Sequence, residues 1–134
     1  MAATDPPREA LADLIDALPG ARVLCLGDVI LDRFVYGEVS RVSPEAPVPV
    51  LKISHEEDML GGAGNVVANV AALGAGATLI SLVGEDPAGT AVAELAGQVA
   101  GLELHLVTVE ERLTPEKSRF IASRQQLLRT DEES

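Results

Sequence analysis

Cysteine and aromatic residues are scarce in this 134-residue sequence, which has one cysteine, two phenylalanines, one tyrosine and no tryptophan. The single cysteine, Cys25, excludes an internal disulfide, and its place in an apolar run indicates a small buried hydrophobic residue. His55 and His105 have no ligand-like spacing with each other or with Cys25. We therefore predict no metal site.

Positive charge is also scarce, because ten Lys and Arg accompany twenty-one Asp and Glu, for a formal net charge of −11. Such a chain repels phosphate backbones and has too few aromatic side chains for a base-stacking platform, so we expect no nucleic-acid partner. No apolar run reaches the roughly 20 residues that cross a bilayer. Residues 1–10 lack the basic start and apolar core of a signal peptide. We expect a cytoplasmic protein with no membrane partner.

The abundant residues are aliphatic, and the hydrophobic fraction is 47%. Short apolar runs at 22–27, 77–83 and 102–109 alternate with segments of helical character at 65–73 and 86–101. Near-continuous apolar runs are typical of strands buried on both faces. The rhythm of strand, helix, strand, helix and strand predicts an α/β protein with a parallel sheet.

A different pattern occupies residues 34–53 and 116–130, where short β-like pieces flank turns. Three prolines, at positions 44, 47 and 49, exclude a central strand from the first segment and favour edge strands or a flap. The acidic run at 56–58 is interpreted as a solvated loop. We predict a small β-flap assembled from these two separate segments.

Two carboxylates, Asp28 and Asp32, follow the first apolar run directly. Ligands of open parallel sheets bind beyond the carboxyl ends of the strands, and one carboxylate accepts hydrogen bonds from two sugar hydroxyls. The alternative interpretation is a pair of loop acids that cap a turn.

A glycine-rich stretch begins at Gly61 and Gly62 and reaches Asn65 at the start of a helix. Glycines let a backbone approach a ligand closely, and the free amides and dipole of the helix favour polar or anionic groups there. An ordinary turn remains the alternative. The glycine-rich stretch is not a dinucleotide-binding fingerprint, because Val67 stands where that motif requires Gly or Ala. The sequence also has no phosphate-binding G-x-x-x-x-G-K-[ST] loop.

Four cations, Lys117, Arg119, Arg124 and Arg129, gather near the end of this acidic chain. Arginine suits bidentate binding of phosphate. The alternative is an exposed hairpin with solvated charges.

Together, the segments Val23–Arg33, Tyr36–Val50, Gly61–Gly74 and Gln125–Arg129 resemble the PfkB/ribokinase-type carbohydrate kinases. More narrowly they resemble the heptose 7-phosphate kinase domain of bifunctional heptose kinase/adenylyltransferases of lipopolysaccharide and ADP-heptose biosynthesis. The resemblance covers roughly residues 10–133. It implies a ribokinase-like α/β fold, here the N-terminal part, 1–134, of a kinase domain, with β-lid segments at about 34–53 and 116–130.

The resemblance also implies roles for particular residues. The implied enzyme transfers the γ-phosphate of ATP, with Mg2+, to a sugar phosphate, D-glycero-D-manno-heptose 7-phosphate, and forms a homodimer through the β lid. The implied substrate-binding residues are Asp28, Asp32, Gly61, Gly62, Asn65, Arg119, Arg124 and Gln125.

The resemblance implies that the catalytic base and anion hole lie in a Gly-x-Gly-Asp motif far downstream, together with the ATP pocket, and this motif has no counterpart here. We therefore expect no catalytic residue and no ATP or Mg2+ site in this chain, and we expect the chain alone to be an inactive fragment. The alternatives are a non-catalytic sugar-phosphate-binding or dimerisation module and, more distantly, a dinucleotide-binding domain.

Overall fold

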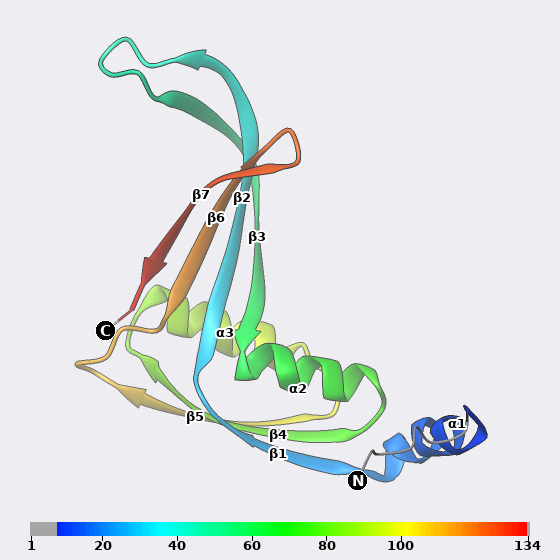
Figure 1. Ribbon diagram of the computed structural model, residues 1–134. Coiled ribbons are helices and arrows are strands. Elements are labelled where there is room, and N and C mark those ends of the chain that lie inside the picture. Colours follow the sequence, from blue (N-terminus) through cyan, green and yellow to red (C-terminus); the bar gives the residue numbers. More distant parts are fainter. Residues whose placement is uncertain (1–7, 134) are drawn as a thin grey trace, which may run out of the picture.

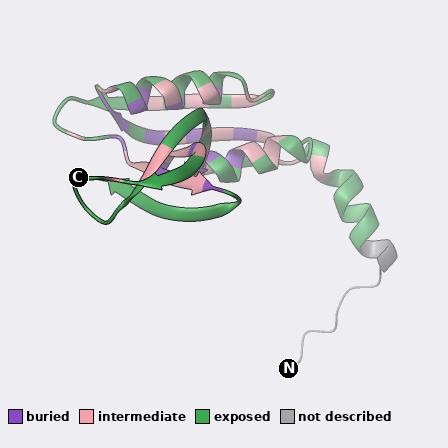
Figure 2. Cartoon of the chain, turned by 90° about the horizontal axis from the view of Figure 1, so that it is seen from above, coloured by how far each residue is buried: buried purple, intermediate pink, exposed green. Residues whose placement is uncertain are grey.

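The computed structural model describes residues 8–133, which form two β-sheets and three α-helices (Figure 1). The first helix, α1 (Arg8–Ala17), ends in a 3-10 turn at Leu18–Gly20. The sequence predicts that Thr4 or Asp5 caps a helix whose first turn starts at Pro6 and Pro7, and these four residues lie outside the described residues. Figure 2 shows that residues 11–17 of α1 are exposed and that buried residues gather where the other helices meet the strands.

The first sheet is parallel and has three strands in the order β1 (Arg22–Leu26), β4 (Gly76–Gly84) and β5 (Leu102–Val109). Helix α2 (Ala63–Ala72) precedes β4, and helix α3 (Pro87–Gly97) connects β4 to β5. The predicted α/β class with a parallel sheet is confirmed.

The hydrophobic core lies where both helices meet both sheets. Leu79 of β4, Val67 of α2 and Val92 of α3 are fully buried together with Val29 and Leu31. Each such side chain contributes roughly 1.5–3 kcal/mol when it leaves water. The last two residues belong to the second sheet, so this core also fixes the second sheet to the first.

The expectation that the strands of the first sheet are buried on both faces is wrong. In β1, Leu24 and Leu26 are 66% and 79% exposed, and in β4 burial alternates along the strand. Helices α2 and α3 lie on the same face of this sheet (Figure 1), and no element within residues 8–133 covers the opposite face. Cys25 points to the covered face and packs against the core.

The second sheet has four strands in the order β3, β2, β6 and β7. Strands β2 (Val29–Val42) and β3 (Pro49–Gly62) form a long antiparallel hairpin, and β6 (Glu116–Ala122) pairs with β2 in parallel and with β7 (Gln125–Glu132) antiparallel. The sheet thus joins two segments far apart in sequence. Residues 38–53, here called the arm, continue past β6 and β7 and curve away (Figure 1).

Two sequence interpretations change in this sheet. The acidic run at 56–58 is not a loop but part of edge strand β3, where Asp58 faces Arg33 across the strand pair. Asp32 is not in a loop either, because β2 begins at Val29. In both cases a cross-strand basic partner, which local sequence does not reveal, makes the charged residue acceptable in a strand.

Candidate functional site

Asp32 lies in β2 and points toward two groups on neighbouring strands. Arg119 of β6 donates from Nη1 to Asp32 Oδ1 at 2.5 Å, and both side chains are 22% exposed. On the other side, the carboxylate occupies the space above Gly61 of β3, where a Cβ atom would collide with Asp32 Oδ2. The acid is therefore held between a guanidinium and a bare stretch of backbone, and remains partly open to solvent.

The glycine-rich turn is anchored to the end of the first sheet. Gly62 has φ +56°, and a Cβ there would meet the carbonyl oxygen of Asp28. The next amide, at Ala63, donates to that same carbonyl at 2.9 Å. Gly61 and Gly62 thus have a steric reason to be glycine, and the turn places Asp28 and Asp32 on either side of it.

The side chain of Asp28 is 72% exposed and receives a hydrogen bond from Arg112 Nη2 at 3.0 Å. Arg112 follows β5, and its Nε is buried without a hydrogen-bond partner among the described residues. Asp28 and Arg112 line a cavity of about 240 Å3 with Ile30, Pro115 and Glu133. Arg112 carried no signal in sequence, since only the tertiary fold brings it to the strand end.

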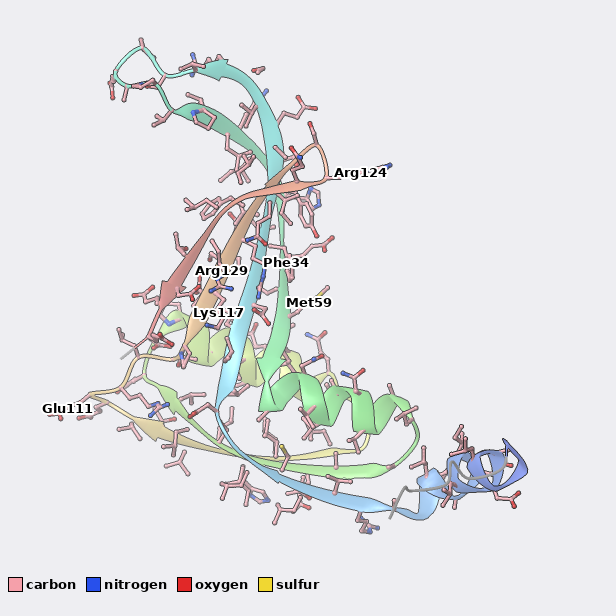
Figure 3. All side chains as sticks on the ribbon, viewed as in Figure 1. Phe34, Met59, Glu111, Lys117, Arg124 and Arg129 are labelled. Atoms are coloured by element: carbon pink, nitrogen blue, oxygen red, sulfur yellow. The ribbon has the colours of Figure 1, made fainter. Side chains whose placement is uncertain are left out.

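Asn65 lies in the first turn of α2, where Asn69 Nδ2 donates to its Oδ1 at 3.0 Å and to its backbone oxygen at 2.8 Å. Arg124 and Gln125 lie instead at the β6–β7 turn. Figure 3 shows Arg124 projecting away from the sheet, well separated from Lys117 and Arg129. Arg124 lines a cavity of about 380 Å3 beside the stacked rings of Tyr36 and His55.

Five of the residues predicted from sequence lie in one connected group: Arg119 binds Asp32, Asp32 lies against Gly61, and the next residue, Gly62, lies against the backbone carbonyl of Asp28. Arg124 and Gln125 mark the far end of the same sheet. A partly exposed carboxylate with a fixed guanidinium beside it and the exposed Gly62 in the next position of the turn is suited to a polyhydroxylated, anionic ligand.

A larger cavity, of about 650 Å3, opens beyond the carboxyl ends of β4 and β5 beside the start of α3. Its lining includes Asp86, Thr90 and Thr108 but none of the sequence-predicted residues. Asp86 has a structural role, because its carboxylate accepts hydrogen bonds from the amides of Gly89 and Thr114 at 2.7 Å each.

Arg33, which the sequence analysis did not single out, stabilises the second sheet from the face opposite to that of Asp32. Arg33 of β2 donates to both oxygens of Asp58 on β3, at 2.9 and 3.0 Å, and to Glu116 on β6 at 3.1 Å. The hydrogen bond with Asp58 raises the pKa of Arg33 further despite partial burial. Three neighbouring strands are thereby tied together next to the site.

A parallel sheet with helices, joined to a second β-sheet that overhangs its strand ends, defines the ribokinase-like class of α/β fold. Residues 21–130 match the family model described as pfkB family carbohydrate kinase. The chain belongs to the pfkB family, as its motifs predicted.

Individual relatives agree with this family. The chain is 57% identical over 125 residues to the bifunctional protein HldE of Caulobacter vibrioides, covering 93% of the chain and 26% of that relative. It is 52% identical over 111 residues to D-beta-D-heptose 7-phosphate kinase of Bordetella bronchiseptica, covering 83% and 35%. The chain thus spans about a quarter to a third of the length of these curated relatives.

Solved structures of other proteins share this fold. A carbohydrate kinase from Agrobacterium tumefaciens superposes with a TM-score of 0.66 at 28% identity, covering 84% of this chain and 35% of that one. The Arabidopsis thaliana ribokinase complexed with ribose and ATP gives a TM-score of 0.60 at 20% identity, covering 85% and 35%. Among residues 8–133, no helix is both long and apolar enough to span a membrane.

Proposed function

We propose that this chain supplies the sugar-binding side of a kinase that transfers the γ-phosphate of ATP to a sugar phosphate, D-glycero-D-manno-heptose 7-phosphate. The family and the names of its relatives support the reaction class and the acceptor. The observation that carries the proposal is the Asp32 carboxylate, held between Arg119 and the backbone at Gly61. The proposal includes a cytoplasmic location.

In this proposal Asp32 and Asp28 accept hydrogen bonds from sugar hydroxyls, while Gly61 and Gly62 let the ring approach the backbone. The four-stranded sheet, with segments at about 34–53 and 116–130, acts as a lid over the sugar. The arm carries exposed Val39, Val42, Val48 and Ile53, which supports a homodimer through this lid. Sedimentation equilibrium of the complete gene product measures that state.

Phosphoryl transfer depends on positioning ATP, Mg2+ and the acceptor together. Within residues 8–133, no group of three or more His, Cys, Asp or Glu side chains is placed to hold a metal ion. The proposal therefore gives this chain the acceptor alone and assigns ATP and Mg2+ to none of its residues. We expect the 134-residue polypeptide by itself to be inactive, and measurable kinase turnover by it would refute this part.

The test is ATP-dependent phosphorylation of heptose 7-phosphate by the complete gene product. The substitution Asp32→Asn removes a charged hydrogen-bond acceptor, so kcat/KM should fall about 10- to 100-fold. The matched control is Asp13→Asn on exposed helix α1, which should leave kcat/KM unchanged. No turnover with heptose 7-phosphate or any other sugar would end the proposal.

A second candidate is a sugar-phosphate-binding module without chemistry of its own, which the contacts of Asp32 with Arg119 and Gly61 support equally well. Calorimetry of the complete gene product separates the two. Heat from heptose 7-phosphate but none from ATP supports the binding module, whereas heat from both supports the kinase.

A further inference from the structure

Arg112 lies in the link between β5 and β6, which passes the end of β4. Its amide donates to the carbonyl oxygen of Val109 at 3.1 Å, and its own carbonyl oxygen is so close to Gly84 that a Cβ atom there would collide with it. The amide of Gly84 donates to the hydroxyl of Thr114 at 2.8 Å. Figure 3 labels Glu111 in this link. The backbone is thus fixed on both sides of Arg112, which fixes the point from which its side chain extends.

From this point the guanidinium of Arg112 reaches the carboxyl end of β1. Its Nη2 donates to Oδ1 of Asp28 at 3.0 Å, although the two residues are 84 positions apart. They follow β5 and β1, which are the two outer strands of the parallel sheet. Arg112 therefore spans the end of this sheet to hold one of the two acids that the proposed function places at the sugar.

Asp28 is in turn connected to the glycine-rich turn through its backbone. Its carbonyl oxygen accepts from the amide of Ala63 at 2.9 Å, and a Cβ at Gly62 would collide with the same oxygen. Ile30 lines one cavity with Asp28 and Arg112, and its Cγ1 lies 3.2 Å from the Cβ position of Gly62. A contact that orients Asp28 therefore also acts on the turn that precedes α2.

Stability does not account for the placement of Arg112. The side chains of Asp28 and Arg112 are 72% and 31% exposed, and ion pairs between groups so exposed contribute little to the free energy of unfolding. Nε of Arg112 is buried without a hydrogen-bond partner among the described residues, which is destabilising. Orientation does account for it, because the exposed Asp28 carboxylate without this contact would be free to change rotamer.

Arg112 is poorly placed to bind an anion by itself. Its Nη2 already donates to Asp28, and Glu133 lines the same cavity. Among the residues that line this cavity, two carboxylates and one guanidinium leave one formal negative charge, which repels phosphate and permits hydroxyl groups. A carboxylate whose first oxygen is held by a guanidinium keeps its second oxygen for such hydroxyls.

We propose that Arg112 is a positioning residue for sugar binding. It holds Oδ1 of Asp28 so that Oδ2 faces the sugar, and through the backbone of Asp28 it steadies the turn at Gly62. Arg112 itself contacts neither the sugar nor the phosphate donor. The inference rests on the proposed function, in which Asp28 accepts hydrogen bonds from sugar hydroxyls.

A double-mutant cycle on the complete gene product tests whether Arg112 acts through Asp28. Calorimetry measures the Kd of heptose 7-phosphate for Arg112→Gln, Asp28→Asn and the double variant. Each single substitution should weaken binding about tenfold. The double variant should bind within about twofold of Asp28→Asn, because Arg112 then has no remaining effect on the sugar. Arg112→Lys keeps the charge but not the fork, so its affinity should lie between those of Arg112→Gln and the wild type.

Steady-state kinetics distinguish positioning from a merely structural role. A variant that is partly unfolded has a lower kcat at unchanged KM, whereas Arg112→Gln should raise KM for heptose 7-phosphate about tenfold and keep KM for ATP within about twofold. Its thermal unfolding should match that of the wild type, since the ion pair is exposed. The matched control is Arg22→Gln, which removes the same charge from the exposed amino end of β1 and should leave every value unchanged. If Arg112→Gln does not fold, Arg112→Lys takes its place in the cycle.

The outcomes separate this inference from the proposed function. If Arg112→Gln binds heptose 7-phosphate like the wild type, the inference is wrong and the kinase proposal stands. If the double variant loses affinity about 100-fold, as the product of two independent losses, Arg112 does not act through Asp28 and the inference is also wrong. If Asp28→Asn binds like the wild type, the inference and the sugar-binding role of Asp28 fail together. If the wild type neither binds nor phosphorylates heptose 7-phosphate, both proposals fail.

Discussion

Gly61 shows at the scale of one residue how backbone space positions a functional side chain. Its missing Cβ leaves room for the Asp32 carboxylate, and the Cβ of Ile30 limits the same space from 3.2 Å away. Asp32 keeps its place because Arg119 binds it from the opposite side. A methyl group at this point must therefore displace the acid or separate the strands.

We predict that Gly61→Ala impairs both substrate binding and folding. The added methyl pushes Asp32 away from the sugar position, so KM for heptose 7-phosphate should rise about tenfold, while overpacking should destabilise by about 1–3 kcal/mol. Steady-state kinetics and thermal unfolding of the complete gene product measure both effects. The matched control is Gly97→Ala, where nothing lies within 4 Å of the new Cβ. An unchanged KM in Gly61→Ala would contradict the assigned geometry.

The candidate residues could be selected from sequence because they stand in recognisable motifs. The residues that surround them in the fold could not be predicted. Asp32 was recognisable beside Asp28, yet its ion pair with Arg119 spans 87 positions. Arg112 had no pattern to mark it, although it holds Asp28. Pairings between residues so distant depend on strand order, which local propensity does not encode.

At the scale of elements, Asp86 connects the start of α3 to the link between the two sheets. It caps α3 through the amide of Gly89, and its second oxygen accepts from the amide of Thr114, just before β6. The hydroxyl of Thr114 in turn accepts from the amide of Gly84 at 2.8 Å. One carboxylate thus fixes the geometry with which the second sheet leaves the first.

We predict that Asp86 makes stability depend on pH in the acidic range. Desolvation opposes its charge, but the hydrogen bonds from Thr114 and Gly89 outweigh it and lower the pKa of Asp86 in the folded protein. A carboxyl with a lowered folded pKa stabilises the fold above its unfolded pKa of about 3.9, and loses that stabilisation as pH falls through the folded value.

The variant Asp86→Asn should lower stability by about 1 kcal/mol at pH 7, because the amide group keeps only one acceptor oxygen. Its thermal unfolding midpoint should also fall less steeply than that of the wild type between about pH 5 and pH 3. The exposed neighbour offers the control Glu85→Gln, which should match the wild type at every pH. Parallel pH profiles for Asp86→Asn and the wild type would show that another group is responsible.

Element types were largely predictable, whereas strand length was not. The Asp86-Pro87 start of α3 and the hairpin at 116–130 follow from caps and turn spacing. The turn itself departs from the usual residues, since Ser123 and Arg124 take φ of 49° and 67° where Asn and Gly are favoured. The full 14-residue length of β3 was missed because its acidic residues are typical of a loop. Their place in a strand depends on the basic partner Arg33 on the neighbouring strand.

At the scale of the whole molecule, the described residues leave one face of the three-stranded sheet uncovered. Leu24 and Leu26 of β1 are exposed on that face, and Val107 of β5 is 52% exposed. Parallel sheets occur almost only with both faces covered. Strand β1 also ends the sheet, so its outer backbone groups lack a strand partner within residues 8–133. Exposed apolar patches and open edges both favour association.

We predict that the 134-residue polypeptide, produced by itself, self-associates through this face. Sedimentation velocity should show species larger than the proposed lid dimer at micromolar concentration, and the double variant Leu24→Lys with Leu26→Lys should remove these larger species. Because both side chains are largely exposed, the substitutions should change stability by only about 0.5 kcal/mol. The control is Leu73→Lys, 58% exposed at the end of α2, which should associate like the wild type. A wild-type polypeptide that forms no species larger than a dimer would show that the uncovered face is compatible with water, and the argument from incomplete layering would be wrong.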